Sequence, residues 1–435
     1  MSDDIIKTAD HERKEYIEQT KRWKTIEALT ERYQDIKDHP ARRDYLIPMP
    51  AEHDEVYKDR LKRLYLWPAV SETIAGMVGI ITSKGFSVDT IKNDQLRSEI
   101  LTPLKGDGSL TKLLDRFAKA VCQYGHGFIL VSPGSEVNAN KAEDNFNKRR
   151  VRWTVYTPVS VINWSVEDEA EAGDPRFANY VVLKKFVERE KGDFGHEAIE
   201  VYLKISQAGT QSYIKRESES EPTKDGELIP HKKASGELLG LLPMVAAYYN
   251  FLAPFVSKAP LNSMAQLNIA HLNATSNSDL AIRQSQFTIP VFSGVRQEHQ
   301  KDLADLVVGP TIGLKLPAGV KFDLVETTGK SLDIGLKNIT EIEKKINQMS
   351  FKELMADPNI SRDVTATEAG IKQQNKLSPL AAAALNIESA INEAIRIHAS
   401  YIGVEIGPTE LFKVNFDLAR VVLGSDERRV MIELL

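Results

Sequence analysis

The pattern of apolar and polar positions is most regular in the C-terminal half, where it predicts three long helices. The first is predicted from Pro260 to about Phe287, and the proline suits its first turn because that turn needs no N–H from it. The second is predicted from Ser331 to about Met355. It carries a narrow apolar stripe in steps of three and four residues, formed by Leu332, Leu336, Ile339, Ile342, Ile346 and Met349. The third begins at a capping box, Thr365-Ala366-Thr367-Glu368, and extends to about Ile402.

A compact α/β insert is predicted between the first two helices. Thr288 to Phe292 has the composition of an edge strand, because Pro290 cannot donate a hydrogen bond to a neighbour. A short amphipathic helix and two further strand-like stretches follow, over Gln297–Val307, Thr311–Leu316 and Val320–Val325. A polar loop, residues 357–363, separates the second and third helices. The predicted order is therefore long helix, small α/β insert, long helix, polar loop, long helix.

The middle of the first long helix is unusual, because residues 273–279 are small and polar and are poor helix formers. An isolated helix of that composition would fray, so neighbours must hold it. This composition fits a surface exposed to a wet channel or an interface. The narrow stripe of the second helix instead fits a helix that is pressed against neighbours on one side.

The N-terminal half alternates between helical and strand patterns, and the whole sequence predicts an α+β fold. Helices are predicted over residues 9–37, 54–66, 68–81 and 110–124. Strands of antiparallel type follow over residues 127–131, 152–156, 161–166, 180–189, 198–205 and 211–216. The charged stretch 217–227 is expected to be a hairpin tip, and Val414–Phe416 a strand that returns to the N-terminal region.

The order of elements in the C-terminal half resembles that of the portal proteins of tailed bacteriophages, in a portal-like subgroup. Three stretches carry the likeness further, and they are Tyr45-Leu46-Ile47-Pro48-Met49-Pro50, Gly106-Asp107-Gly108-Ser109-Leu110, and the run from Leu261 to His271. The resemblance covers roughly Tyr45 to Ile402. Its specificity lies in the order and spacing of the elements.

The resemblance implies a division of the chain into the parts of a portal. Residues 1–257 would form the wing, made of an N-terminal helical arm, an α/β region and an antiparallel β region. Residues 258–287 and 329–355 would be the two stem helices, and residues 288–328 the small α/β clip between them. Residues 356–364 would be the tunnel loop and residues 365–402 the long tunnel helix. Residues 403–435 would return a strand to the wing and begin a short or truncated crown.

The resemblance also implies a function without bond chemistry, enzyme activity, cofactor or metal. A ring, expected to be a dodecamer, would form a channel at one capsid vertex through which double-stranded DNA is packaged and ejected. The clip, represented by Ile289, Val291 and Phe292, would dock the terminase and later a head–tail adaptor, and the wing would face the major capsid protein. Such a protein is assembled in the host cytoplasm and resides in the virion.

Three residues of the tunnel loop are expected to line the DNA channel: Asn359, Ser361 and Arg362. The resemblance places this loop at the narrowest part of the channel. For Arg362 the alternative is an ordinary loop arginine that is paired with a carboxylate.

Composition agrees better with a conduit than with a protein that grips DNA. The chain has 56 basic and 61 acidic residues and a formal net charge of −5, whereas proteins that neutralise phosphates are usually basic. DNA must slide through a conduit without being held. No run of eighteen apolar residues suggests a membrane span, no apolar signal region follows Met1, and the single cysteine, Cys122, excludes disulfides within the chain.

Patterns typical of catalysis are weak in this sequence. Gly329-Lys330-Ser331 lies where a P-loop would end, but Leu324 occupies the position of the required glycine. A turn followed by a helix is therefore expected there. No pair of histidines has the spacing of a zinc protease, although a nuclease site built from distant carboxylates stays open. His271 and His398 fall within predicted helices and are expected to be packing or interface residues.

The densest basic run is Lys148-Arg149-Arg150-Val151-Arg152, directly before Trp153. It is expected to be a solvated loop that enters a strand, with a nucleic-acid patch as the alternative.

Two other functions are left open by the sequence as a whole. One is a different phage head or neck structural protein, and the other, less favoured, is a DNA-packaging ATPase or nuclease.

Overall fold

The computed structural model confirms an α+β fold and contains two compact units. It describes residues 8–30, 36, 42–82, 84–104, 108–133, 151–166, 174–191, 195–216, 219–286, 289–295, 319–325, 330–350 and 366–415. The first unit comprises Met1–Glu31, Pro68–Ala265 and Ser350–Leu435, and the second comprises Arg32–Trp67 and Gln266–Met349. Residues 32–67 thus belong to the same unit as residues 266–349, although the sequence suggested that they belong to the N-terminal region.

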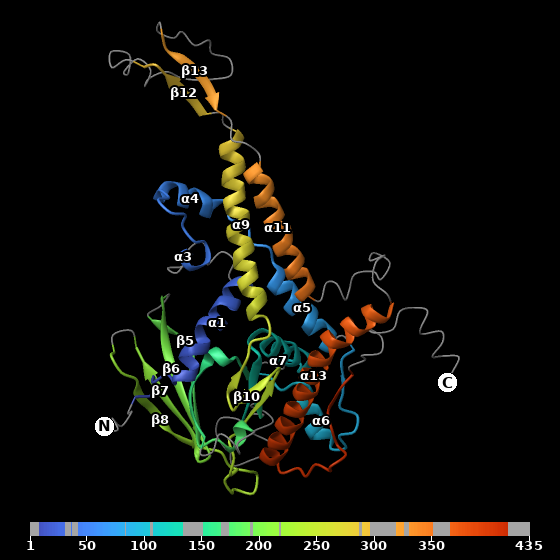
Figure 1. Ribbon diagram of the computed structural model, residues 1–435. Helices are drawn as coiled ribbons and strands as arrows, with labels where there is room; N and C mark the ends of the chain where they lie inside the picture. The colour runs from blue at the N-terminus through green and yellow to red at the C-terminus, as the bar shows by residue number, and fades with distance from the viewer. Residues whose placement is uncertain are drawn as a thin grey trace, which may run out of the picture. The chain divides into compact units, whose positions relative to one another are not determined.

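The core of the first unit is built on a three-stranded antiparallel sheet (Figure 1). Its order is β3-β2-β9, formed by β3 (Arg152–Tyr156), β2 (His126–Ser132) and β9 (Met244–Tyr248). Helix α7 (Leu110–Tyr124) packs against β2, and α13 (Ala366–Ile402) packs against β9. Ser109 caps α7 by accepting a hydrogen bond from the Lys112 N–H. The predicted bounds of α7 and β3 are confirmed.

A second sheet of the first unit has five antiparallel strands in sequence order. These strands are β4 (Val161–Ser165), β5 (Tyr180–Lys191), β6 (Gly195–Ser206), β7 (Gly209–Lys215) and β8 (Thr223–Pro230). Ile199, Val201 and Ile214 form a small apolar cluster on it. The sequence analysis missed β8, whose eight residues are all exposed. A strand without a buried face shows no alternation, and pairing with the edge of β7 is what defines it.

The remaining elements of the first unit surround these sheets. The helices are α1 (Lys14–Thr30), α5 (Ala69–Thr82) and α6 (Asp94–Leu101), with short 3-10 turns at Pro158–Ser160 and Pro175–Phe177. The short strands β10 (Phe251–Ala253) and β11 (Val256–Ser257) pair with each other. Strand β14 (Lys413–Val414) pairs with β1 (Phe86–Ser87), so the chain after α13 returns to the first unit as expected.

Gly125, which ends α7, occupies a position that tolerates no side chain. Its φ is +89°, and a Cβ there would lie 2.6 Å from the Lys258 carbonyl oxygen. Gly85 has a similar φ of +69° but would meet no atom within 4 Å.

We expect Gly125→Ala to destabilise the first unit by about 2–5 kcal/mol, because backbone strain and a clash with backbone add up. Gly85→Ala carries only the backbone strain and should cost about 1–2 kcal/mol. Thermal unfolding of both variants measures the difference. Equal losses of stability would contradict the close approach at Gly125.

His126 is a fully buried histidine on β2, and it makes the first unit sensitive to acid. Its ring lies against Trp23, Phe128 and Tyr248, with centroids 5.7, 5.2 and 5.6 Å away. Burial lowers the pKa of His126 to about 3, because the charged form loses its hydration. The folded protein therefore excludes a proton that the unfolded chain accepts near pH 6.5.

Stability from His126 should be constant above pH 6.5 and should fall as the pH decreases from there towards 3. The slope from this one group approaches about 1.4 kcal/mol per pH unit. We expect His126→Phe to remove it, so that denaturant unfolding at pH 7, 6 and 5 gives a shallower dependence than in the wild type. Parallel pH profiles would contradict a proton-excluding His126.

Among its described residues, the second unit has two long helices, two short ones and a two-stranded sheet (Figure 1). The long helices are α9 (Asn262–Gln286), whose first residues belong to the first unit, and α11 (Lys330–Met349). The short helices are α3 (Arg42–Tyr45) and α4 (Asp54–Lys62). Strands β12 (Ile289–Ser293) and β13 (Lys321–Val325) form an antiparallel pair between α9 and α11 along the chain. The predicted long helices and the edge strand at Pro290 are confirmed.

Candidate functional site

A histidine–glutamate contact joins the two long helices of the second unit. His271 on α9 is 5% exposed, and its Nε2 lies 3.2 Å from Glu343 Oε1 on α11. Farther along, a Cβ placed on Gly335 would lie 3.9 Å from Ser278 Oγ, an ordinary van der Waals contact. His271 also packs on Trp67, with ring centroids 5.3 Å apart. The expectation that His271 is a packing residue is confirmed.

The segment from Tyr45 to Trp67 binds to another side of α9 through backbone groups. Asn273 donates from Nδ2 to the Tyr45 carbonyl at 2.7 Å and accepts the Ile47 N–H at Oδ1 at 2.9 Å. Asn268, which is 1% exposed, donates to the Trp67 carbonyl at 2.9 Å. Tyr45 and Ile47, from one of the stretches that carry the portal resemblance, are thus held by Asn273 of α9.

A buried ion pair lies at the centre of this contact. The Arg60 and Glu52 side chains are 3% and 2% exposed, and Arg60 Nη1 lies 2.8 Å from Glu52 Oε2. Arg60 also donates from Nε to Ser276 Oγ at 3.1 Å and from Nη2 to Asn277 Oδ1 at 2.8 Å. One guanidinium therefore ties α4 and the preceding turn to α9.

The polar middle of α9 is held by neighbours, as expected, and these neighbours belong to the same chain. Asn273, Ser276 and Asn277 bind residues 45–60 of the same chain instead of facing a wet channel. The sequence shows that this stretch is small and polar. Its partners have no signal in the local pattern, because they lie more than two hundred positions earlier in the chain. These contacts remove one argument for a water-filled channel, because binding within the chain already explains why the residues are polar.

Helix α11 leaves apolar side chains exposed. Of its stripe, only Ile346 is fully buried, whereas Leu336 and Met349 are 49% and 46% exposed. Ile334, outside the stripe, is 68% exposed. The described part of the chain thus covers the apolar side chains of this helix incompletely.

The predicted clip residues lie on β12, where they pair with β13. Val291 pairs with Asp323 and is 38% exposed, and Phe292 pairs with Phe322. Ile289 pairs with Val325 at the other end of the strand. The three residues therefore share one short strand, and their role in docking stays a prediction. The predicted channel residues Asn359, Ser361 and Arg362 lie outside the described residues.

The patterns considered for catalysis give no reactive constellation in the described part of the chain. Lys330 is the first residue of α11, and Gly329 lies outside the described residues. Among the described residues, no three His, Cys, Asp or Glu side chains gather as metal ligands would, and no helix is long and apolar enough to span a membrane.

His398 is completely buried in the first unit and serves packing. Its Nδ1 accepts the Trp153 Nε1–H at 3.2 Å, so the proton belongs on Nε2, which lies 3.0 Å from Glu99 Oε2. Both ring nitrogens are occupied by protein groups. His398 thus packs inside the first unit, in agreement with the expectation of a packing or interface residue.

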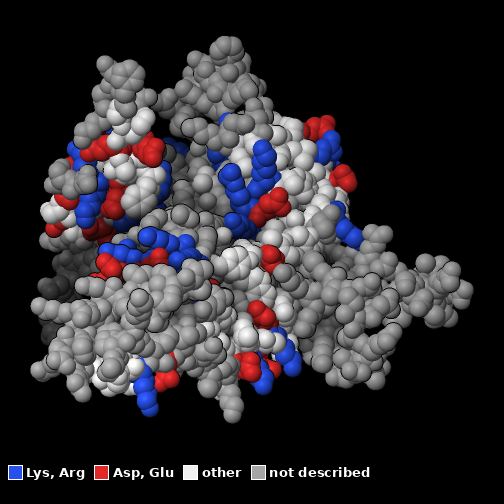
Figure 2. Space-filling view, turned by 90° about the horizontal axis from the view of Figure 1, so that it is seen from above, with Lys and Arg blue, Asp and Glu red and all other residues white. Residues whose placement is uncertain are grey.

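Charge on the surface is mixed. Figure 2 shows Lys and Arg side chains next to Asp and Glu on the described residues of that face. Several exposed pairs are local in sequence, such as Arg63–Asp59 at the end of α4 and Arg283–Asp279 on α9. On the described residues of this face, the mixed charge does not form a continuous track for a phosphate backbone.

Comparisons with known proteins give one family match and several structural similarities. The family described as "Domain of unknown function (DUF4055)" matches residues 260–402. This range extends from the start of α9 to the end of α13. No protein with a curated description matches the chain.

Three solved structures contain similar chains. A chain in "Virion of native gene transfer agent (GTA) particle" is 11% identical, with a TM-score of 0.43 over 89% of this chain and 90% of that chain. A chain in "Neck of empty GTA particle computed with C6 symmetry" is 10% identical, with a TM-score of 0.43 over 88% and 94%. One in "Neck of native GTA particle computed with C12 symmetry" is 10% identical, with a TM-score of 0.38 over 84% and 89%.

Proposed function

We propose that this protein is a structural component of a phage-type particle, and specifically a portal. Identical copies would form a closed ring, expected to be a dodecamer, at a capsid vertex, and DNA would pass through its channel. The single observation that carries the proposal is the helix–strand-pair–helix arrangement of α9, β12–β13 and α11, with apolar side chains left exposed on α11. The resemblance of the sequence to portal proteins is the reason for proposing that the ring is a portal.

The exposed residues of α11 explain why copies would associate. Covering Leu336, Ile334 and Met349 with a neighbouring copy removes apolar surface from water, at about 25 cal/mol per Å². A ring uses two different surfaces of each copy, and the rotation between copies must close. In this proposal α9 is held internally by residues 45–67, and α11 provides the contact between copies.

The charge of the chain suits passage of DNA. At −5 per copy, a ring of many copies is strongly acidic, and its repulsion of phosphate extends over about 8–10 Å in physiological salt. DNA would therefore be guided without being gripped. The strand pair β12–β13 would dock the terminase and later an adaptor, and Arg362 in the tunnel loop would face the DNA.

Electron microscopy of the purified full-length protein tests the proposal. We expect end-on views to show annuli with an open centre at micromolar protein concentration. A monodisperse single chain without annuli would contradict the portal. DNA-stimulated ATP hydrolysis by the pure protein would also contradict it and would favour a packaging enzyme.

A further inference from the structure

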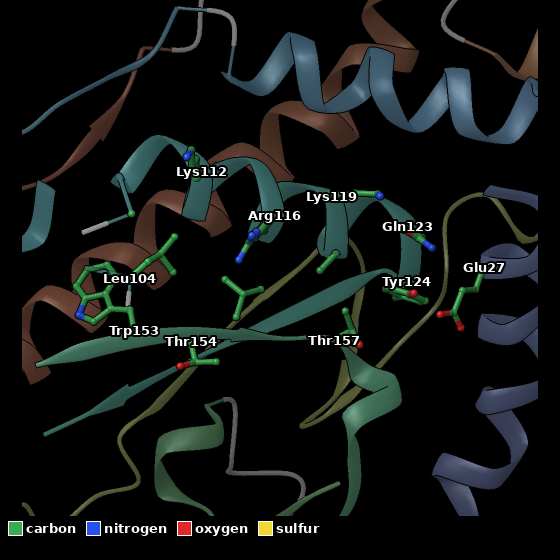
Figure 3. A pocket seen from close by; sticks show the side chains of 13 residues that line it. Glu27, Leu104, Lys112, Arg116, Lys119, Gln123, Tyr124, Trp153, Thr154 and Thr157 are labelled. Atoms are coloured by element: carbon green, nitrogen blue, oxygen red, sulfur yellow. The ribbon is translucent and has the colours of Figure 1, made fainter. Parts of the chain in front are cut away.

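A groove in the first unit lies outside the proposed ring contact and combines two features that point to a peptide ligand. It has a volume of about 670 Å³ and runs between α7 and β3, with Glu27 of α1 at one end (Figure 3). This volume is within the range of about 300–1,000 Å³ that ligand sites have.

One wall of the groove is positively charged. Lys112, Arg116 and Lys119 recur at four- and three-residue spacing on α7, so they lie on one face of the helix, and all three are exposed. In the described part of the chain, Lys112 and Arg116 form no ion pair. Figure 3 shows these side chains along the helix above β3. This wall attracts carboxylates or phosphates.

The other wall is the β3 edge of the described sheet, whose Trp153 end is covered by residues 103–104. In the order β3-β2-β9, β3 pairs on only one side within its described sheet. The Trp153 N–H donates to the Pro103 carbonyl at 3.0 Å. Val131, which pairs with Trp153 across the two strands, donates its N–H to the Pro243 carbonyl. Neither of these N–H groups therefore points into the β3–β2 ladder.

Hydrogen-bonding direction alternates along an antiparallel strand. Two residues after Trp153, the N–H and C=O of Val155 therefore also point away from β2, on the side where Val155 lines the groove. These two groups can extend the ladder to an added strand.

We propose that this groove binds an extended acidic segment of a partner protein, which adds to the edge of β3 and presents carboxylates to Lys112 and Arg116. Alternate side chains of a strand lie about 6.6–6.8 Å apart on one face. Lys112 and Arg116 are separated by about 6 Å along the axis of α7. A segment with acidic residues at alternate positions therefore matches both walls at once.

The same features disfavour a nucleic acid in the groove. Single strands bind by stacking bases on exposed aromatic rings, but Trp153 and Tyr124 are only 1% and 4% exposed. A peptide can use the donor and the acceptor of Val155.

Fluorescence anisotropy with the full-length protein tests the proposal. The probe is the labelled peptide Thr-Glu-Val-Glu-Val-Glu-Thr, and a peptide of equal composition with adjacent glutamates is its control. We expect Arg116→Glu to weaken binding of the probe at least about tenfold. Lys232→Glu, which reverses an exposed charge away from the groove, should leave binding unchanged.

Strand addition has a separate test on the ligand, which leaves the protein intact. N-methylation of alternate amides of the probe removes its ladder donors and should weaken binding about fivefold. Val155→Pro, which removes only an outward N–H on an edge strand, should act similarly. No binding of the probe, no effect of Arg116→Glu, or tighter binding of a single-stranded oligonucleotide would each overturn the proposal.

Discussion

Replacing Arg60 with alanine should destabilise the second unit more than any other single change in it. The substitution leaves Glu52, which is 2% exposed, as a buried carboxylate without its cation. Breaking a buried pair in this way costs about 3–5 kcal/mol. The loss also releases Ser276 and Asn277, so hydrogen exchange in α4 and the middle of α9 should accelerate together.

Arg63→Ala is the matched control for this prediction. Arg63 lies on the next turn and pairs with Asp59 in solvent, with side chains 44% and 52% exposed, so its loss should cost at most about 1 kcal/mol. The double variant Arg60→Met with Glu52→Leu should recover much of the stability, because no unpaired charge remains. Similar losses for Arg60→Ala and Arg63→Ala would refute the assigned role of the buried pair.

Aspartate at two exposed apolar positions of α11 should dissociate the proposed ring without unfolding the chain. Ile334 and Leu336 are 68% and 49% exposed, so Ile334→Asp with Leu336→Asp disturbs little within one copy. Burying such side chains stabilises by about 1.5–3 kcal/mol each. The pair should therefore weaken each contact between copies at least about a hundredfold.

Sedimentation velocity measures this effect, with circular dichroism as the test of folding. Lys344→Asp, at an exposed polar position of the same helix, is the control and should keep the assembly intact. If the double variant sediments like the wild type, α11 does not provide the contact between copies.

Much of the fold could be predicted from the sequence because it follows from local periodicity. Helices α7, α9 and α13 and strands β3 to β7 show apolar residues at the spacing that burial requires. Strand β8 could not be predicted, because a fully exposed strand has no such pattern. What defines it is hydrogen bonding to β7, a property of the neighbour.

The candidate sites were less predictable, because they depend on contacts between distant residues. Asn273 gave a signal as a poor helix former, but its partners Tyr45 and Ile47 are not visible in any local pattern. Arg60 resembled an ordinary surface cation on a charged helix, and only the structure reveals its burial against Glu52. The groove at α7 was missed in the same way, because Lys112 and Arg116 become a site only beside β3.

Native mass spectrometry of the purified full-length protein tests the central claim most directly. If neighbouring copies cover the exposed apolar residues of α11, the main species at micromolar concentration should have a mass that is a fixed multiple of 48.7 kDa, expected to be twelvefold. A predominant species of 48.7 kDa under those conditions would contradict the account, because exposed helices would then need no second copy.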